Sequence, residues 1–417
     1  MNNGLKASYV TLGCKVNRYE TEAVRAKLEA AGFETVRPTE KADVCVVNTC
    51  AVTATAEAKS RAAVRKLISA SPDALVVVCG CSAEINPQDL TDIKGVSLVL
   101  GNDKKPDIAD IIIAKLGARD PLKVKPRLRT RAAVKVQDGC DNFCAYCIIP
   151  YARRGMTSRP IGEVMAEIEG LAAAGYKEIV LTGIRLGSYD DSGVDTAGLV
   201  RKVCGVPGIE RIRMSSIEPW EVTDGLIGAM KHPKVCRHLH IPLQSGSDSV
   251  LEQMNRPYTS AEFLSLAEKV RREIPEIGIT TDIIVGFPGE SEDDFADTLR
   301  TAEAAGFSRT HSFRYSVRKG TAAAEMTGQI PEGVKKERAA RLNDLTDSLS
   351  LEFARKMTGK TYPVLIERFD AETGLARGFT DNYVEVYVET PPGTKTNRII
   401  DVEIAEATAE RVLGKAK

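Results

Sequence analysis

The sequence predicts an α/β protein in three parts: an N-terminal doubly wound parallel domain, a partial (β/α)6 barrel of the TIM type, and a small antiparallel β-barrel. Three observations predict it. Apolar β-branched runs alternate with helical periodicity over residues 1–118, and six more such units fill residues 132–358 without a dinucleotide fingerprint. Residues 359–417 alternate with period two and carry turn residues. A basic, proline-containing stretch, PLKVKPRLRTR, predicts a linker at 119–131.

Composition indicates a globular enzyme, because 43% of the 417 residues are apolar and 27% are charged. No apolar run approaches the roughly 20 residues needed to span a bilayer, and MNNGLKASYVTLG lacks the pattern of a signal peptide. We therefore expect a cytoplasmic protein without a membrane partner. Thiols stay reduced in that compartment, so the ten cysteines favour metal binding or catalysis over disulfides.

In the N-terminal part, the strands are SYVTL, DVCVV, LVVVC and VSLVL, and the helices are expected at 17–31, 53–70, 87–90 and 108–116. Cys14, Cys50 and Cys81 follow the ends of three successive strands. Because the carboxyl ends of parallel strands lie along one edge of a sheet, the three thiols can converge there.

The second part has its own series of expected elements. The strands are AVKVQ, EIVLTG, RIRMSS, HLHIPL, GITTDIIVGF and THSFRYS, with helices at about 161–174, 193–204, 221–231, 248–254, 260–273 and 291–305. A long polar helix at about 332–358 follows, before the strands of the last part. His238 and His240 alternate on one strand, which is typical of hydrogen-bonded core or rim residues.

The motif GCDNFCAYCIIP places Cys140, Cys144 and Cys147 on one loop after a strand. Three thiolates can hold three irons of a [4Fe–4S] cube and leave the fourth iron open. Zinc would need a distant fourth ligand, and the chain has only four histidines. A buried structural trio is the remaining alternative.

This motif, with Tyr146 before the last cysteine, resembles the radical S-adenosylmethionine superfamily. Further segments resemble the methylthiotransferases within it, in order along nearly the whole chain: LGCKVN, VNTCAVT, GCSAE, GCDNFCAYCIIPYARRGMTSRP, LTGIRLGSY, SSIEP, HIPLQSGSD, DIIVGFPGE and FRYSVRKGTAA. The resemblance implies an N-terminal methylthiotransferase domain, a radical domain and a C-terminal TRAM domain that holds RNA.

The resemblance also implies two [4Fe–4S] clusters and S-adenosylmethionine. The radical cluster would be held by Cys140, Cys144 and Cys147, and its open iron would chelate S-adenosylmethionine. The second cluster would carry the sulfur to be transferred, on Cys14, Cys50 and Cys81. One S-adenosylmethionine would donate a methyl group and another would supply a deoxyadenosyl radical, as opening an unactivated C–H bond requires. The implied partners are the anticodon stem-loop of tRNA, a reductase or flavodoxin-like electron donor, and a sulfur source.

The substrate prediction depends on LGCKVN, where Lys15 and Val16 resemble the branch that acts on threonylcarbamoyladenosine at position 37 of tRNA. Isopentenyladenosine in tRNA and an aspartate of a ribosomal protein are the alternatives within the family. An iron–sulfur RNA-binding protein without catalysis is an alternative of another class. Cys79 or Cys45 could ligate in place of a neighbouring cysteine, but we favour Cys81 and expect Cys45, Cys204 and Cys236 to be buried apolar residues.

Contacts to S-adenosylmethionine are expected from strand ends and from the cluster loop. The candidates are Tyr146, Gly183, Glu218, Gln244 and Gly286. The alternative is that the glycines are turn residues and the polar side chains are rim residues.

RNA phosphates are expected near Arg153, Arg154 and Arg159, directly after the cluster loop, with structural ion pairs as the alternative. Residues 360–417 contain eight basic and ten acidic side chains, so RNA binding there would need a local stripe. The residues considered for it are Arg368, Arg377, Lys395 and Arg398, with Phe379 and Tyr383 for stacking.

Overall fold

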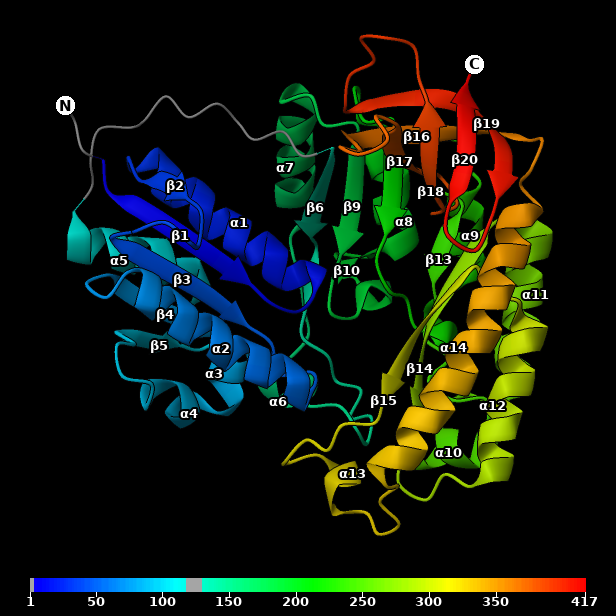
Figure 1. Cartoon of the computed structure of the whole chain (residues 1–417), viewed down its shortest axis with the longest axis horizontal. Helices are drawn as coiled ribbons and strands as arrows, with labels where there is room; N and C mark the ends of the chain where they lie inside the picture. The colour runs from blue at the N-terminus through cyan, green and yellow to red at the C-terminus, as the bar shows by residue number, and fades with distance from the viewer. Residues whose placement is uncertain (1–3, 118–129) are drawn as a thin grey trace. The chain divides into compact units, whose positions relative to one another are not determined.

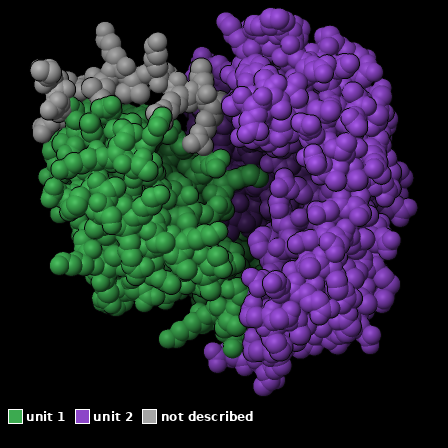
Figure 2. Space-filling view, viewed as in Figure 1, with its two compact units in different colours: residues 1–127, 139–156, 316–324 green, residues 128–138, 157–315, 325–417 purple. Residues whose placement is uncertain are grey.

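The computed structural model describes residues 4–117 and 130–417, so most of the predicted linker at 119–131 lies outside the described residues. The chain forms two compact units, which Figure 2 shows in different colours. Unit 1 comprises Met1–Arg127, Gly139–Met156 and Ser316–Ala324, and unit 2 comprises Leu128–Asp138, Thr157–Tyr315 and Glu325–Lys417. The loop that carries the second cysteine motif thus belongs to the unit of the N-terminal sheet.

Unit 1 is built on a five-stranded parallel sheet with the order β2-β1-β3-β4-β5 (Figure 1). The strands are β1 (Lys6–Thr11), β2 (Glu34–Val36), β3 (Val44–Thr49), β4 (Leu75–Gly80) and β5 (Leu98–Leu100). The helices are α1 (Lys15–Ala30), α2 (Ala54–Ala70), α3 (Cys81–Ile85), α4 (Pro87–Thr91) and α5 (Ile108–Leu116), with a 3₁₀ turn η1 (Lys105–Asp107). The prediction missed β2, which is only three residues long.

Both faces of this sheet are covered. Side chains of α1 and α5 share one core with Ala7, Val44 and Val77, and side chains of α2 and α4 share another with Cys45 and Val76. The doubly wound prediction is therefore confirmed. The strand order reverses between β1 and β3, and in open α/β sheets ligands bind at the carboxyl ends of the strands beside that switch point.

Unit 2 contains six parallel strands in the order of the sequence. The strands are β6 (Arg131–Lys135), β9 (Glu178–Thr182), β12 (Arg211–Met214), β13 (His238–His240), β14 (Gly278–Val285) and β15 (Arg309–Arg314). The strands form two three-stranded sheets, β6-β9-β12 and β13-β14-β15, and the parallel bridges Ile212–Val235 and Ser216–His240 join them. The helices are α7 (Ile161–Ala173), α8 (Thr196–Cys204), α9 (Asp224–Met230), α10 (Asp248–Gln253), α11 (Ser260–Glu273) and α12 (Glu292–Ala305). The partial barrel is confirmed.

Short elements that the sequence did not predict occur in the connections. They are β7 (Gln137–Asp138), α6 (Ile149–Ala152), β8 (Thr157–Ser158), η2 (Leu186–Ser188), β10 (Asp190–Asp191), β11 (Val194–Asp195), η3 (Pro219–Glu221) and α13 (Ala322–Glu325). Within the described ranges, no helix is both long and apolar enough to cross a membrane.

The chain ends with α14 (Glu332–Arg355) and a closed five-stranded barrel of order β16-β17-β18-β20-β19. Its strands are β16 (Thr361–Phe369), β17 (Ala376–Thr380), β18 (Glu385–Glu389), β19 (Arg398–Ala407) and β20 (Val412–Ala416). Four pairings are antiparallel, as predicted, and β18 pairs with β20 in parallel. Strand directions cannot alternate all round a ring of five, so one pairing must be parallel.

The amino-terminal end of the partial barrel is closed by charge pairs and by the C-terminal barrel, all within unit 2. Glu178 is fully buried and pairs with Arg211 and Arg213, at 3.0 Å each. The guanidinium of Arg211 donates to the carbonyl oxygens of Phe379 and Thr380, at 3.0 and 2.9 Å. These contacts cover the end of the barrel opposite the expected active face. We call this end, with Glu178, Arg211 and Arg213, the floor of the barrel.

Candidate functional site

The first strand of unit 1 ends where Gly13 and Cys14 lead into α1. Gly13 has φ +97°, and a Cβ atom there would lie 3.0 Å from both Cβ and Sγ of Cys50. Only glycine lets the loop after β1 approach the loop after β3 this closely. Cys14 is exposed and lies at the N-cap of α1, so the two loops bring Cys14 and Cys50 to one edge of the sheet.

The loop after β4 meets the same place. Gly80 has φ +102°, and a Cβ atom there would lie 2.4 Å from the carbonyl oxygen of Thr49. Burial raises the pKa of Cys50 to about 11, and the nearby thiols of Cys81 and Cys14 also raise it. The loops after β1, β3 and β4 therefore bring Cys14, Cys50 and Cys81 to one edge of the sheet, as the strand ends predict, and their role as cluster ligands stays a prediction.

Two further cysteines of this sheet are directed elsewhere. Cys79 belongs to β4 and to the core beneath α1 and α5, and burial raises its pKa to about 12. Cys45 lies in the opposite core, where its Sγ accepts a hydrogen bond from Ser8 at 3.1 Å. Cys81 begins α3 at the strand end, in contact with apolar side chains of the cluster loop. Cys81 therefore remains the ligand that we favour.

The cluster loop at 139–156 is closed at its base. A Cβ atom on Gly139, which has φ +75°, would lie 1.6 Å from the carbonyl oxygen of Gly155, so the two ends of the loop touch. Within the loop, the Cys147 amide donates to the carbonyl oxygen of Cys144 at 2.9 Å, and the Asn142 amide lies 3.4 Å from Sγ of Cys140. Cys144 is buried and the other two cysteines are half-buried.

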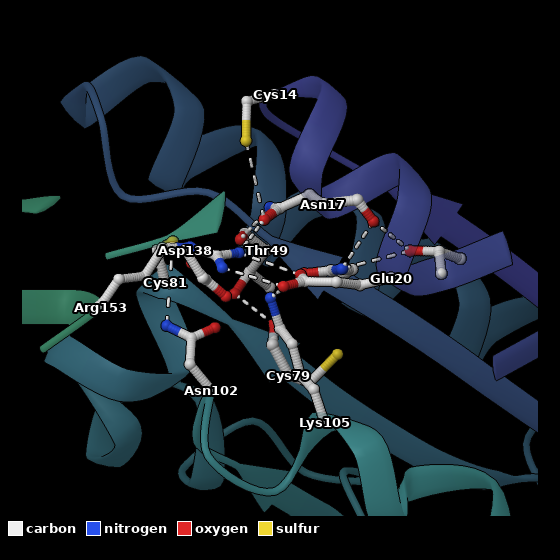
Figure 3. A network of polar contacts seen from close by, with 12 residues as sticks. Cys14, Asn17, Glu20, Thr49, Cys79, Cys81, Asn102, Lys105, Asp138 and Arg153 are labelled. Atoms are coloured by element: carbon white, nitrogen blue, oxygen red, sulfur yellow. Dashed lines mark hydrogen bonds and ion pairs between the residues drawn. The ribbon is translucent and has the colours of Figure 1, made fainter. Parts of the chain in front are cut away.

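Arg153, at the end of α6, connects this loop to α1 (Figure 3). Its guanidinium donates to both carboxylate oxygens of Glu20, at 2.9 and 3.0 Å, and to Oδ1 of Asn17 at 2.8 Å. Lys105 pairs with the same carboxylate at 2.5 Å. All four side chains are buried, and Asn17 also donates to the carbonyl oxygens of Leu12 and Thr49. One network thus fixes α1, the strand ends and the cluster loop.

A second contact attaches the loop to Cys81. Asn102 donates to the carbonyl oxygen of Ala152 at 2.6 Å, and its amide nitrogen lies 4.0 Å from Sγ of Cys81. Ala51, Cys81, Ile148 and Ala152 form a small apolar cluster. Both cysteine trios therefore belong to one unit and are joined by direct contacts.

The arginine predictions need correction. Arg153 is 4% exposed and committed to Glu20 and Asn17, so its prediction as a phosphate contact is wrong. Arg159 is half-buried and pairs with Glu167 at 2.7 Å. Arg154 is exposed and is the arginine of the three that we retain for RNA.

The proposed stacking stripe is also altered. Phe379 and Tyr383 stack on each other at 5.1 Å between ring centroids. Arg131 lies over Phe379, and Arg213 lies 4.5 Å from the centroid of Tyr383. Both rings therefore contribute to the floor of the barrel, and since they are half-buried their contact with RNA stays a prediction.

The candidate contacts to S-adenosylmethionine are divided between the units. Tyr146 lies half-buried in unit 1, and the other four lie in unit 2. Glu218 follows β12 and forms an ion pair with buried Arg256. Gln244 is buried with φ +64°, a backbone strain that in folded proteins is concentrated at functional sites.

Two glycines among these candidates have structural reasons of their own. A Cβ atom on Gly183 would lie 2.9 Å from Oε1 of Gln137. Gly286 has φ +74°, and a Cβ atom there would lie 2.4 Å from Cγ of Lys335. Backbone conformation and packing require glycine at Gly286, whereas a larger residue at Gly183 would have to displace the Gln137 side chain. Contact of either glycine with S-adenosylmethionine stays a prediction.

Sequence reasoning assigned no role to Asn17, Glu20, Lys105 or Asn102. Asn17 was part of the quoted LGCKVN motif, but Asn102 and Lys105, which begins η1, lie in a segment with no distinctive pattern. Their role depends on contacts between segments up to 136 residues apart, which no local pattern reports.

The donor sets fit iron–sulfur clusters. Each trio offers three thiols on short loops, and cysteine thiolate is the usual ligand of [4Fe–4S] clusters. The guanidinium of Arg153 lies near Cys14, a member of the first trio (Cys14, Cys50 and Cys81), where its positive charge offsets the charge of a thiolate.

Comparisons with known proteins agree with this geometry. Residues 134–302 match the model of the radical SAM superfamily, and residues 6–101 match uncharacterized protein family UPF0004. The chain is 40% identical to threonylcarbamoyladenosine tRNA methylthiotransferase MtaB of Bacillus subtilis, over 96% of this chain and 94% of that protein. The chain belongs to the radical S-adenosylmethionine methylthiotransferases. This enzyme family uses S-adenosylmethionine and a [4Fe–4S] cluster, and residues 134–302 include the cluster loop.

A second relative belongs to a different branch. The chain is 35% identical to tRNA-2-methylthio-N(6)-dimethylallyladenosine synthase of Caldicellulosiruptor saccharolyticus, over 97% of this chain and 88% of that protein. Among solved structures, the radical S-adenosylmethionine methyltransferase TsrM of Kitasatospora setae has a TM-score of 0.59 at 14% identity, covering 82% of this chain and 89% of that one. That likeness shows the fold alone.

Proposed function

We propose that this methylthiotransferase converts N6-threonylcarbamoyladenosine at position 37 of tRNA to its 2-methylthio derivative. The observation that carries the proposal is that both cysteine trios lie in one unit. Hydrogen bonds of Arg153 to Glu20 and Asn17 connect the loop of one trio to the helix that follows Cys14. A radical reaction that also delivers sulfur needs two cofactor sites held in a fixed relation.

In this proposal, Cys140, Cys144 and Cys147 hold the radical cluster and Cys14, Cys50 and Cys81 hold a second [4Fe–4S] cluster. When bound, the clusters and S-adenosylmethionine supply the electron, the radical and the methylated sulfur. The chain itself holds and orients these groups: Gly13 and Gly80 allow the strand-end loops to meet, and Arg153 fixes the cluster loop against α1. A flavodoxin-like reductase and a separate sulfur source complete the reaction.

The choice of substrate is supported by the relatives and by the start of α1. The relative named for threonylcarbamoyladenosine is 40% identical, and the one named for dimethylallyladenosine is 35% identical. Of the two indicative residues after Cys14, Val16 is buried and Lys15 is exposed. Of these two, Lys15 is therefore the one whose side chain lies at the surface, next to Cys14.

The test is anaerobic reconstitution followed by turnover with anticodon stem-loop RNA. We expect about eight irons per chain, four in each cube. With dithionite and S-adenosylmethionine, the protein should release 5′-deoxyadenosine, and nucleoside mass spectrometry should find 2-methylthio-threonylcarbamoyladenosine in the RNA. Release of 5′-deoxyadenosine without that product would refute the substrate, and no release at all would favour a non-catalytic RNA-binding protein.

A further inference from the structure

Three side chains that the proposed function has not used meet on adjacent strands of unit 2. His240 ends β13, Asp282 lies on β14 and His311 lies on β15. Asp282 and His311 are direct partners in the parallel register. One ring nitrogen of each histidine and one carboxylate oxygen of Asp282 all lie within 4.8 Å of one another. The cluster is therefore a compact group of hydrogen-bonding atoms.

The cluster lies on the face of the strands that turns away from the helices. Residues of odd number on β14, such as Ile279 and Ile283, are fully buried in the core that includes Phe263 of α11 and Phe295 of α12. Since side chains alternate along a strand, Thr280 and Asp282 point to the opposite, inner face of the partial barrel. The Asp282 side chain is 30% exposed there and that of His240 is 12% exposed.

The ring of His240 is held in a defined orientation. Its Nδ1 lies 3.0 Å from Oγ1 of Thr280, which also lies 3.0 Å from Nε2 of His238. This arrangement directs the other ring nitrogen, Nε2, toward Oδ1 of Asp282 at 3.4 Å. A hydrogen-bonded imidazole of fixed orientation is suited to ligand recognition, because its entropy is already lost.

The position along the strands places the cluster between the floor and the active face. His238, two residues earlier on β13, packs against Tyr383 at the floor, with 4.5 Å between ring centroids. On the other side, Gln244, with its left-handed backbone, forms a parallel β-bridge with Ile283, the residue that follows Asp282 in β14. The cluster is thus the polar layer of the inner wall next to the carboxyl ends, where barrel enzymes bind substrates.

We propose that His240, Asp282 and His311 form the subsite for the polar N6 substituent of the modified adenosine, and select it against an apolar substituent. The inference rests on the proposed function and names the residues that read the substrate. An imidazole N–H can donate to the carboxylate or carbamoyl oxygen of a threonylcarbamoyl group, and Asp282 can accept from its hydroxyl or amide. A dimethylallyl group would cover these atoms without satisfying them, and sites built for hydrogen bonds reject such analogues strongly.

The experiment compares two anticodon stem-loop RNAs, one with threonylcarbamoyladenosine and one with isopentenyladenosine, on the cluster-loaded enzyme. The variants are His311→Ala, His311→Gln and Asp282→Asn, and His232→Ala is the control because His232 is an exposed histidine outside the cluster. The readouts are kcat/KM for each RNA, RNA binding, release of 5′-deoxyadenosine and metal content.

We expect His311→Ala and Asp282→Asn to lower kcat/KM for the threonylcarbamoyl RNA about tenfold to a hundredfold, with little loss on the isopentenyl RNA. His311→Gln, which retains an N–H donor, should recover part of the loss, and the control should behave as wild type. RNA-independent release of 5′-deoxyadenosine should continue in all variants.

Equal loss on both RNAs, or unchanged selectivity, would overturn the subsite. So would the loss of one stoichiometric metal ion other than iron from His311→Ala, because the cluster would then be a metal site. If wild type modifies neither RNA, or prefers the isopentenyl RNA, the proposed function itself fails, and that result is independent of the variants.

Discussion

A buried arginine–glutamate network of unit 1 can be compared with one of unit 2. In unit 1, Arg153 pairs with Glu20 at the carboxyl ends of the parallel strands. In unit 2, Arg213 pairs with Glu178 at the amino ends of the barrel strands. In both pairs each side chain is no more than 8% exposed.

The two networks differ in what surrounds them. The unit 1 network includes Asn17 and Lys105 and lies beside the thiols of Cys14 and Cys81. The unit 2 network ends on backbone carbonyl oxygens of the C-terminal barrel, such as that of Thr380. Buried arginine–glutamate pairs thus position the cysteine loops in unit 1 and attach the C-terminal barrel to the partial barrel in unit 2. This agrees with the general rule that the carboxyl ends of parallel strands carry functional sites and the amino ends contribute to stability.

The strongest test of this contrast removes the cofactor edge itself. Replacing Cys14, Cys50 and Cys81 by Ala should abolish methylthiolation, remove about four irons and leave release of 5′-deoxyadenosine intact. Replacing Cys140, Cys144 and Cys147 should abolish that release as well. Iron analysis and chromatography of the products check both results. A triple variant that retains all its iron would refute the ligand assignment.

Arg153→Met should affect both stability and clusters. It leaves the buried carboxylate of Glu20 with Lys105 alone, and breaking a buried pair costs about 3–5 kcal/mol of unfolding free energy. Denaturant unfolding and the iron content after reconstitution are the measurements. Arg154→Met, at an exposed position of the same loop, is the matched control and should change stability by about 0.5 kcal/mol or less.

Arg213→Met should destabilise unit 2 by a similar amount, about 3–5 kcal/mol, but leave the iron content unchanged. The reason is that Glu178 loses a buried partner at the floor, in a different unit from the cysteines. Arg300→Met, which breaks an exposed pair with Asp297, is the control. A loss of iron from Arg213→Met would contradict the division between the two networks.

Gly80→Ala should have a smaller effect on stability, about 1–3 kcal/mol from its left-handed backbone, and should reduce the iron bound by the first trio. The added Cβ atom would press on the Thr49 carbonyl oxygen and displace Cys81. Gly193→Ala, with φ +82° and no atom within 4 Å of the added carbon, tests the backbone cost alone. Iron content should distinguish the two.

The smallest effect concerns acid stability in unit 2. Burial raises the pKa of Asp294, but hydrogen bonds from Ser247, Ser291 and Ser249 outweigh it and hold that pKa well below its usual value. The carboxylate therefore contributes stability above its unfolded pKa of about 4, and this contribution is lost as the pH falls toward the folded value. Asp294→Asn should flatten the acid side of the stability curve, measured by circular dichroism on cluster-free protein. An unchanged slope would contradict this.

Several features could be predicted from the sequence because they depend on local pattern. Apolar periodicity gave the parallel sheet, the six-unit barrel and the final β-barrel. The position of each cysteine after a strand gave the convergence of Cys14, Cys50 and Cys81. The contacts of Phe379 and Tyr383 with Arg131 and Arg213 could not be predicted, because they join segments that are far apart in the sequence.

Residue type and spacing along the chain are enough to predict the kinds of element, their order and the two thiol motifs. The three-dimensional fold was needed to place the cluster loop with the N-terminal sheet, to pair buried Arg153 with Glu20, and to bring His240, Asp282 and His311 together. Each of these depends on side chains from distant segments arriving at the same place. A charged residue has the same letter in the sequence whether it faces solvent or a buried partner, so burial and pairing are decided by the fold.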